Sequence, residues 1–371
     1  MVRAMVPDAV NPGSIRRALV VKLRHHGDVL LASPVFPVLR AAAGNAEIDA
    51  LVYEDTRPML EGHPAIAQVH GIDRAWKQLS APARAAREWR LFTALRARRY
   101  DLLVHLSEHP RGAWLARSLG VRHAVAPNVS GKSSYWKNSF THLFAQPLNA
   151  RRHMVEWNLD ALRRIGIQPP PEERRLGLVP GAEAEARVRT LLASHGLERR
   201  PFVHVHPASR WGFKCWPEER MAELIGALQA RGHAVVLTGA PTEDERRQVA
   251  AILAGCAQKP ADLSGQLSLK ELAALTARAR LFVGVDSAPM HMAAAMGTPV
   301  VALFGPSGEA QWGPWGVPHR VVASLVHPCR PCGIDGCGGS KVSDCLVTLP
   351  GERVLAALDE LLERTAGTRA E

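Results

Sequence analysis

Reactive side chains follow three apolar runs of the sequence, each where a strand would turn into a helix. The first turn ends in Asp28, directly after Arg24, His25, His26 and Gly27. A carboxylate there could act as a general base, and its basic neighbours would favour its ionised form. Gly27 would let the backbone turn tightly. Asp28 could also simply cap the following helix, and the two roles are compatible.

The second turn joins a hydroxyl to two cationic side chains. Ser209, Arg210 and Lys214 directly follow a predicted strand, and together they would neutralise a diphosphate. A solvated basic loop is the alternative. Two tryptophans in this polar stretch, Trp211 and Trp216, favour an ordered site.

The third turn predicts an anion site at the start of a helix. The apolar run 281–285 reads as a buried strand, and Asp286 and Ser287 are typical cap residues. Ser287 and the N–H groups from Ala288 onward could hold a phosphate, as bare helix N-termini do. His291 would add a second polar contact, unless it is a helix histidine with its partners inside the protein.

A fourth candidate site is a single carboxylate. Glu243 follows a predicted strand and could accept a hydrogen bond from a ribose hydroxyl, or only cap its helix. The sequence contains no GxGxxG, GxxxxGK[ST] or GxSxG motif and no DxD pair. Phosphate charge would then be neutralised by Lys214, Arg210 and helix dipoles, and not by a divalent ion.

Four cysteines lie close together near the C-terminus, at Cys329, Cys332, Cys337 and Cys345. Such thiols could bind zinc or an iron–sulfur cluster, but their spacing matches neither a common zinc ribbon nor a ferredoxin run. A disulfide is a second possibility. We expect reduced loop cysteines and no metal.

Strands and helices alternate along the whole chain, which predicts parallel α/β sheets. The expected strands are 17–23, 46–53, 100–106, 121–126, 201–206, 233–238, 281–285, 299–304 and 321–325. The expected helices are 28–43, 156–165, 217–231, 243–253, 269–278, 290–296 and 351–364, and the stretch 131–147 reads as an irregular functional loop. Ser268 and Glu271 would form a capping box for the helix 269–278.

A linker with four prolines at 168–180 suggests two Rossmann-like domains facing across a cleft. The predicted division is an N-terminal domain at 1–170, a C-terminal domain at 171–350, and a terminal helix and tail at 351–371. Residues 1–14 lack the apolar core of a signal peptide and are expected to be a loose leader.

A net charge of +11 and a pI of about 9.8 indicate anionic partners. The densest cluster lies on a predicted helix that carries Arg84, Arg87, Arg90, Arg96, Arg98 and Arg99. It could be a solvated helix face, or a surface for a membrane or an anionic acceptor. No zinc-finger, RRM or helix-turn-helix signature is present, so nucleic acid is not expected as a partner.

Four stretches resemble glycosyltransferase family 9, the lipopolysaccharide core heptosyltransferases. They are VVKLRHHGDVLLASPVFPVLR, HPASRWGFKCWPEE, GVDSAPMHMAAAMGTPVVALFGPS and HPCRPCGIDGCGGSKVSDCLVTLP. The first and last most resemble heptosyltransferase III, and the likeness extends from about Arg17 to Glu363. It implies a GT-B fold with the acceptor in the N-terminal domain and the donor in the C-terminal one. It also implies inverting, metal-independent transfer of heptose from ADP-L-glycero-β-D-manno-heptose, without a cofactor.

The resemblance also assigns roles to residues. The catalytic aspartate of the family falls on Asp28, and its diphosphate lysine falls on Lys214 with help from Ser209. Its DTGxxH motif falls on Asp286, Ser287, Ala288 and His291, so Ser-Ala stands where Thr-Gly is usual, and its ribose glutamate falls near 241–243. On the acceptor side we expect Arg24, His25, Gly27 and Lys132.

The expected partners are a nucleotide-sugar donor, a phosphorylated lipopolysaccharide core acceptor and, transiently, an anionic membrane surface. The expected location is the cytoplasm, peripheral to the inner membrane of a Gram-negative bacterium. Two alternatives remain open. One is a nucleotide-sugar 2-epimerase of similar architecture, and the other is a non-catalytic nucleotide-sugar-binding protein.

Overall fold

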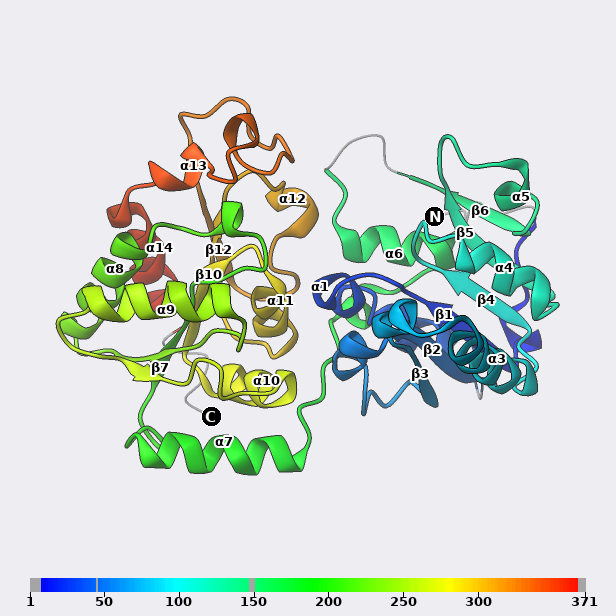
Figure 1. The fold of residues 1–371 in the computed structure, drawn as a ribbon, viewed down its shortest axis with the longest axis horizontal. Coiled ribbons are helices and arrows are strands. Elements are labelled where there is room, and N and C mark those ends of the chain that lie inside the picture. The colour runs from blue at the N-terminus through cyan, green and yellow to red at the C-terminus, as the bar shows by residue number, and fades with distance from the viewer. Residues whose placement is uncertain (1–7, 45, 147–150, 366–371) are drawn as a thin grey trace. The chain divides into compact units, whose positions relative to one another are not determined.

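A computed structural model describes residues 8–44, 46–146 and 151–365 of the chain. The chain divides into two compact units between Val179 and Pro180 (Figure 1). This division lies inside the predicted linker, nine residues after the predicted boundary at 170/171. Residues 1–7 and 366–371, which include most of the proposed tail, lie outside the described residues.

The first unit contains a parallel six-stranded sheet with the order β3-β2-β1-β4-β5-β6. Its strands are β1 Arg17–Val21, β2 Glu47–Tyr53, β3 Gln68–Ile72, β4 Leu102–His105, β5 His123–Asn128 and β6 His142–Ala145. Its helices are α1 His26–Leu30, α2 Val35–Ala43, α3 Ala81–Ala97, α4 Arg111–Ser118, α5 Ser134–Lys137 and α6 Met154–Arg163. The central strands β1 and β4 are almost wholly buried, because a parallel sheet is covered on both faces.

Three expectations for the first unit need correction. The predicted helix 28–43 is two helices, α1 and α2, separated by a tight turn that ends at Pro34. The predicted loop 131–147 contains α5 and β6. Residues 8–14 are not loose, since the Val10 N–H donates to the Ile165 carbonyl at 3.0 Å and Asp8 pairs with Arg164 at 2.7 Å.

The second unit repeats the arrangement with the order β12-β11-β10-β7-β8-β9. Its strands are β7 Phe202–His206, β8 Ala234–Leu237, β9 Ala261–Asp262, β10 Leu281–Val285, β11 Val300–Phe304 and β12 His319–Ala323. Its helices are α7 Ala182–Ser194, α8 Glu218–Ala230, α9 Glu243–Gly255, α10 Leu269–Arg278, α11 Ala288–Ala295, α12 Glu309–Trp312, α13 Asp344–Val347 and α14 Gly351–Arg364. Counted from its own first strand, each sheet has the order 3-2-1-4-5-6, which confirms the predicted α/β class with two Rossmann-like units.

Local signals fixed several elements of the second unit. The predicted capping box is present, with Ser268 Oγ accepting from the Glu271 N–H and the Glu271 carboxylate accepting from the Ser268 N–H. Strand β10 pairs closely with β7 at Gly284, where an added Cβ would lie 2.8 Å from the His206 carbonyl oxygen. A side chain at this position would therefore push the two central strands apart.

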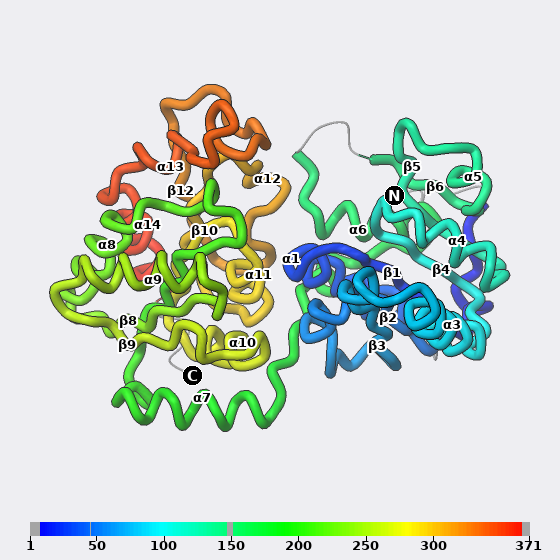
Figure 2. Tube along the Cα trace, in the orientation of Figure 1, coloured from blue at the N-terminus to red at the C-terminus, as the bar shows by residue number. Residues whose placement is uncertain are grey.

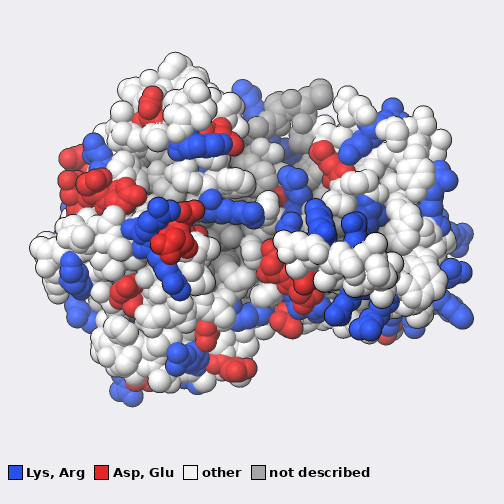
Figure 3. All heavy atoms as spheres, in the orientation of Figure 1, with Lys and Arg blue, Asp and Glu red and all other residues white. Residues whose placement is uncertain are grey.

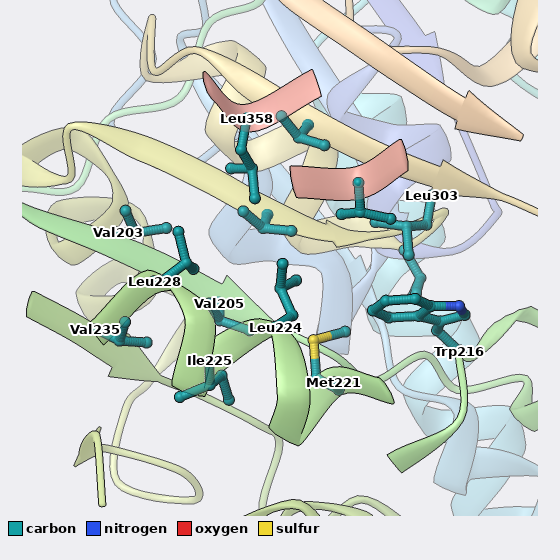
Figure 4. Packing of buried hydrophobic residues seen from close by; sticks show 14 of the residues in the cluster. Val203, Val205, Trp216, Met221, Leu224, Ile225, Leu228, Val235, Leu303 and Leu358 are labelled. Atoms are coloured by element: carbon teal, nitrogen blue, oxygen red, sulfur yellow. The ribbon is translucent and has the colours of Figure 1, made fainter. Parts of the chain in front are cut away.

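The larger core of the second unit lies on the side of the sheet covered by α8, α9 and α14 (Figure 4). Trp216 is 1% exposed within it, and its indole N–H donates to the Leu349 carbonyl at 3.2 Å. The terminal helix α14 is part of this core, because Leu358 and Leu361 are fully buried there. The chain path in Figure 2 shows α7 and α10 running close together, and these helices cover the opposite face. None of the described helices is long and apolar enough to cross a bilayer.

Candidate functional site

Each sheet reverses its strand order at one place, between β1 and β4 in the first unit and between β7 and β10 in the second. In open α/β sheets, ligands bind at this switch point, beyond the carboxyl ends of the strands. All three turns singled out in the sequence follow a strand that borders a switch point: β1, β7 or β10.

Asp28 lies in the short helix α1, just after β1. The helix begins at His26 with His25 at the N-cap position, so Asp28 is its third residue and not its cap. Gly27 is the second residue of the helix. The Asp28 side chain is 13% exposed, and Arg24 Nε lies 3.6 Å from its Oδ1. A carboxylate in the first turn of a helix is stabilised by the unpaired N–H groups.

Lys22 lies in the same turn, and the sequence predicted no role for it. The residue is 2% exposed, and its Nζ donates to the Leu106 carbonyl at 2.9 Å and to Asn158 Oδ1 at 3.0 Å. Asn158 in turn donates to the Leu31 carbonyl at the end of α1. Burial lowers the pKa of Lys22 to about 8, while the charge of Asp28 opposes this shift. Lys22 therefore ties the Asp28 turn to the end of β4 and to α6.

Two more residues at this edge belong to the carboxyl ends of β4 and β5. Ser107 is 3% exposed, and its Oγ has no hydrogen-bond partner among the described residues. Lys132, which was expected on the acceptor side, donates to the Glu108 carbonyl at 2.9 Å, and its Nζ lies 5.0 Å from the centre of the Trp136 ring. Lys132 and Ser107 thus both follow central strands of the sheet that holds Asp28.

The second switch point brings two predicted phosphate-site residues together. Lys214 Nζ donates to Asp286 Oδ2 at 2.6 Å, linking the loop after β7 to the end of β10. The Lys214 side chain is 23% exposed, whereas that of Asp286 is 7% exposed. An ammonium has three N–H donors, so the ion pair orients Lys214 and leaves donors to bind a further anion.

The helix α11 starts beside this ion pair. Ser287 is at its N-cap position and Ala288 is its first residue, but the Ser287 side chain makes no capping bond. Ser287 Oγ is buried and has no hydrogen-bond partner within the described ranges. His291 is 3% exposed in the same helix. The helix start thus offers backbone N–H groups and an unused hydroxyl, as an anion site requires.

The other predicted donor residues take different positions. Ser209 Oγ accepts a 3.3 Å bond from the Trp211 N–H. Arg210 is exposed, and its guanidinium lies 5.5 Å from the centre of the Trp211 ring. Glu243 is exposed at the start of α9, whereas Glu245 reaches back and accepts from the Ala240 N–H at 2.7 Å. Burial raises the pKa of Glu245.

The cysteines near the C-terminus are all free thiols. Cys345 is buried, while Cys329 and Cys332 are exposed. Burial raises the pKa of the Cys345 thiol, and the other three cysteines add to the rise. Within the described part of the chain, no three His, Cys, Asp or Glu side chains are grouped so that they could hold a metal ion.

The amino-acid sequence of this chain is similar to those of known glycosyltransferases. The sequence profile of glycosyltransferase family 9 (heptosyltransferase) matches residues 88–341. The chain is 37% identical to lipopolysaccharide heptosyltransferase 3 of Escherichia coli over 349 residues, which is 93% of this chain and 99% of the relative.

Solved structures agree on the fold. A glycosyltransferase family 9 protein from Veillonella parvula aligns with a TM-score of 0.81 at 23% identity, covering 96% of this chain and 99% of the other. The E. coli ADP-heptose LPS heptosyltransferase II aligns with a TM-score of 0.75 at 22% identity, covering 95% and 100%. These neighbours confirm the GT-B fold, and the family match sets aside the epimerase and the non-catalytic binding protein as alternatives. The chain belongs to glycosyltransferase family 9 and is a heptosyltransferase of the lipopolysaccharide core.

Proposed function

We propose that this enzyme transfers heptose from ADP-L-glycero-β-D-manno-heptose to a heptose of the lipopolysaccharide inner core, with inversion at the anomeric carbon. The observation that carries the proposal is the Lys214–Asp286 ion pair beside the open start of α11. This arrangement suits a diphosphate leaving group, and the name of the E. coli heptosyltransferase II includes ADP-heptose. The relatives of this chain are named lipopolysaccharide heptosyltransferases, so the acceptor that we propose is the lipopolysaccharide core.

In the proposed mechanism, Asp28 removes the proton of an acceptor hydroxyl as a general base. The acceptor oxygen then attacks the anomeric carbon from the face opposite the ADP, and the bond from that carbon to the β-phosphate oxygen breaks. Negative charge grows on the departing diphosphate. Lys214, Ser287 and the N–H groups of α11 would stabilise this charge, with Ser209, Arg210 and His291 as further donors. Glu243, or its neighbour Glu245, would contact the ribose.

The charge stabilisation in this mechanism comes from protein groups, so we propose that the reaction needs neither a metal nor a cofactor. Product formation should then be unchanged by EDTA. The assay would follow ADP release with purified enzyme and core lipopolysaccharide that lacks one heptose. Loss of activity in EDTA that Mg²⁺ restores would contradict metal-free catalysis.

The donor and the reaction type need a separate test. A panel of ADP-heptose and UDP-sugars should give turnover only with ADP-heptose, and only when acceptor is present. The anomeric configuration of the product, read from its NMR coupling constants, should be opposite to that of the donor. Turnover without acceptor, or retention of configuration, would contradict the proposal. We further propose that the enzyme works at the cytoplasmic face of the inner membrane, where its acceptor lipid would be anchored.

A further inference from the structure

The helix α3 of the first unit is exposed to an unusual degree. Residues 81–87 are all exposed, and Leu95 is the one buried residue of its seventeen. A helix this exposed gains little from tertiary packing, which is the main source of helix stability in proteins. Its surface is therefore available to a partner.

Large aromatic side chains lie on and beside this helix. Trp89 is 66% exposed, and its ring lies 5.9 Å from that of Phe92, which lies 5.2 Å from that of Trp114 in α4. Trp114 is 42% exposed, and Tyr135 in α5 is 49% exposed. Arg117, one turn after Trp114, lies over the Tyr135 ring at 4.9 Å. We call Trp89, Phe92, Trp114 and Tyr135 the aromatic band.

Cationic side chains share α3 with two rings of the aromatic band, Trp89 and Phe92. The four arginines of α3, all exposed, are Arg84, Arg87, Arg90 and Arg96. The single acidic residue of the helix, Glu88, is held by Arg111 of α4 through two bonds of 2.5 and 2.7 Å. Figure 3 shows Lys and Arg atoms gathered on the side of the first unit where α3 lies. The surface is thus strongly positive, with apolar rings among the charges.

This combination fits one class of partner best. Tryptophan and tyrosine favour the boundary between lipid head groups and acyl chains, where a ring can be half buried. Arginine binds lipid phosphates and is attracted to an anionic leaflet. A second copy of the chain is disfavoured, because two identical positive surfaces would repel each other.

We propose that the aromatic band and the arginines of α3 form the surface by which this enzyme docks on an anionic lipid bilayer. This surface would be the place where the enzyme makes the membrane contact of the proposed function. Its biological role therefore rests on that proposed function. Vesicle binding itself needs neither donor nor acceptor. A failure to bind vesicles with heptosyl transfer intact would therefore contradict only this inference.

The test measures co-sedimentation of the full-length protein with phosphatidylcholine vesicles, with and without phosphatidylglycerol. We expect binding only to the anionic vesicles, and weaker binding at higher salt. The triple variant Arg84→Gln/Arg87→Gln/Arg90→Gln should bind at least about tenfold more weakly. Trp89→Ser, at the most exposed ring, should also weaken binding several-fold, and Trp89→Ser/Trp114→Ser further.

Matched controls lie in the second unit. Arg247→Gln removes a charge from a side chain that is 70% exposed, and Leu325→Ser removes an apolar side chain from a residue that is 84% exposed. Neither should change vesicle binding, and circular dichroism melts should show that all variants fold. Absence of binding by the wild-type chain would overturn the proposal, as would binding that the α3 variants leave unchanged. Binding to single-stranded DNA that is equally tight and insensitive to Trp89→Ser would indicate nucleic acid as the partner instead.

Discussion

The two units place a lysine at the same point of the same strand order, yet in opposite surroundings. Lys22 joins the end of β1 to the end of β4, is 2% exposed and bonds to two neutral oxygens. Lys214 joins the loop after β7 to the end of β10, is 23% exposed in its side chain and bonds to a carboxylate. Both lysines thus bridge a switch point.

The difference indicates what each lysine can do. Lys22 has little access to a ligand, so its charge acts on its own surroundings, chiefly the Asp28 turn. Lys214 is accessible and is oriented by Asp286, so it can bind an anion. The comparison suggests a division of labour in which the first unit holds the base and the second holds the diphosphate.

Asp28→Asn should have the largest effect. It removes the proton acceptor while keeping the shape of the side chain, so kcat should fall by about 10²–10⁴-fold, the usual contribution of a general base. Rapid-quench assays of product would measure it. Asp244→Asn, whose side chain is 88% exposed in the second unit, is the matched control and should leave kcat unchanged. If Asp28→Asn turned over at the wild-type rate, Asp28 would not be the general base.

Lys214→Ala should have the second-largest effect. Loss of one charge-assisted hydrogen bond to the diphosphate costs about 1.5–3 kcal/mol, or about 10- to 150-fold in donor affinity. Steady-state kinetics over a range of donor concentrations would show the loss. The control is Lys341→Ala, at an ammonium that is 65% exposed in the same unit. Equal effects of the two variants would argue against a phosphate role for Lys214.

The pH dependence of activity should report on Lys22. Because its pKa is about 8, raising the pH through this value removes the positive charge that ties the Asp28 turn to Leu106 and Asn158, and kcat/KM should fall as the charged form is lost. This loss of activity should not come from unfolding, because deprotonation of Lys22 does not destabilise the fold above pH 8. Its pKa is lower in the folded state than the ordinary 10.5, so the unfolded chain binds more protons between about pH 8 and 10.5, and stability rises with pH.

Lys22→Arg supplies the contrast, because a guanidinium keeps its charge throughout this range. If this variant folds and turns over at neutral pH, its alkaline decline should be absent. A decline near pH 8 that is the same in both proteins would assign the titration to another group.

The smallest effects should come from the two unused hydroxyls. Ser287→Ala should weaken donor binding by about fivefold, the scale of one neutral hydrogen bond, and leave the acceptor KM unchanged. Ser107→Ala should instead raise the acceptor KM by a similar factor and leave donor binding unchanged. Initial rates measured against each substrate in turn would separate them. If both substitutions changed the KM of the same substrate, the proposed division of roles between the two units would be contradicted.

Much of the fold could be predicted because its signals are local. The apolar run of β10, the capping box of α10 and the amphipathic α14 all lie where the sequence pattern predicted them. Edge strand β3 was missed, because QVHGI is half-buried and has no continuous apolar run. The helix predicted at 28–43 was too long, because a tight turn that ends at Pro34 divides this stretch into two helices.

The site was less predictable where it depends on tertiary contacts. Asp28, Lys214 and Asp286 follow strands and carry charge, so the sequence alone predicts them as site residues. Lys22 looks like the end of a strand, and only the fold reveals that Leu106 and Asn158 surround its ammonium. The choice between Glu243 and Glu245 likewise depends on which face of α9 turns toward the sheet.

The most direct test of the division between the units is one calorimetric experiment with three proteins. ADP would be titrated into the wild type, Asp28→Asn and Lys214→Ala under identical conditions. The account predicts equal affinity for the wild type and Asp28→Asn, and an affinity about 10- to 150-fold weaker for Lys214→Ala. An ADP affinity that Asp28→Asn lowers as much as Lys214→Ala does would contradict it.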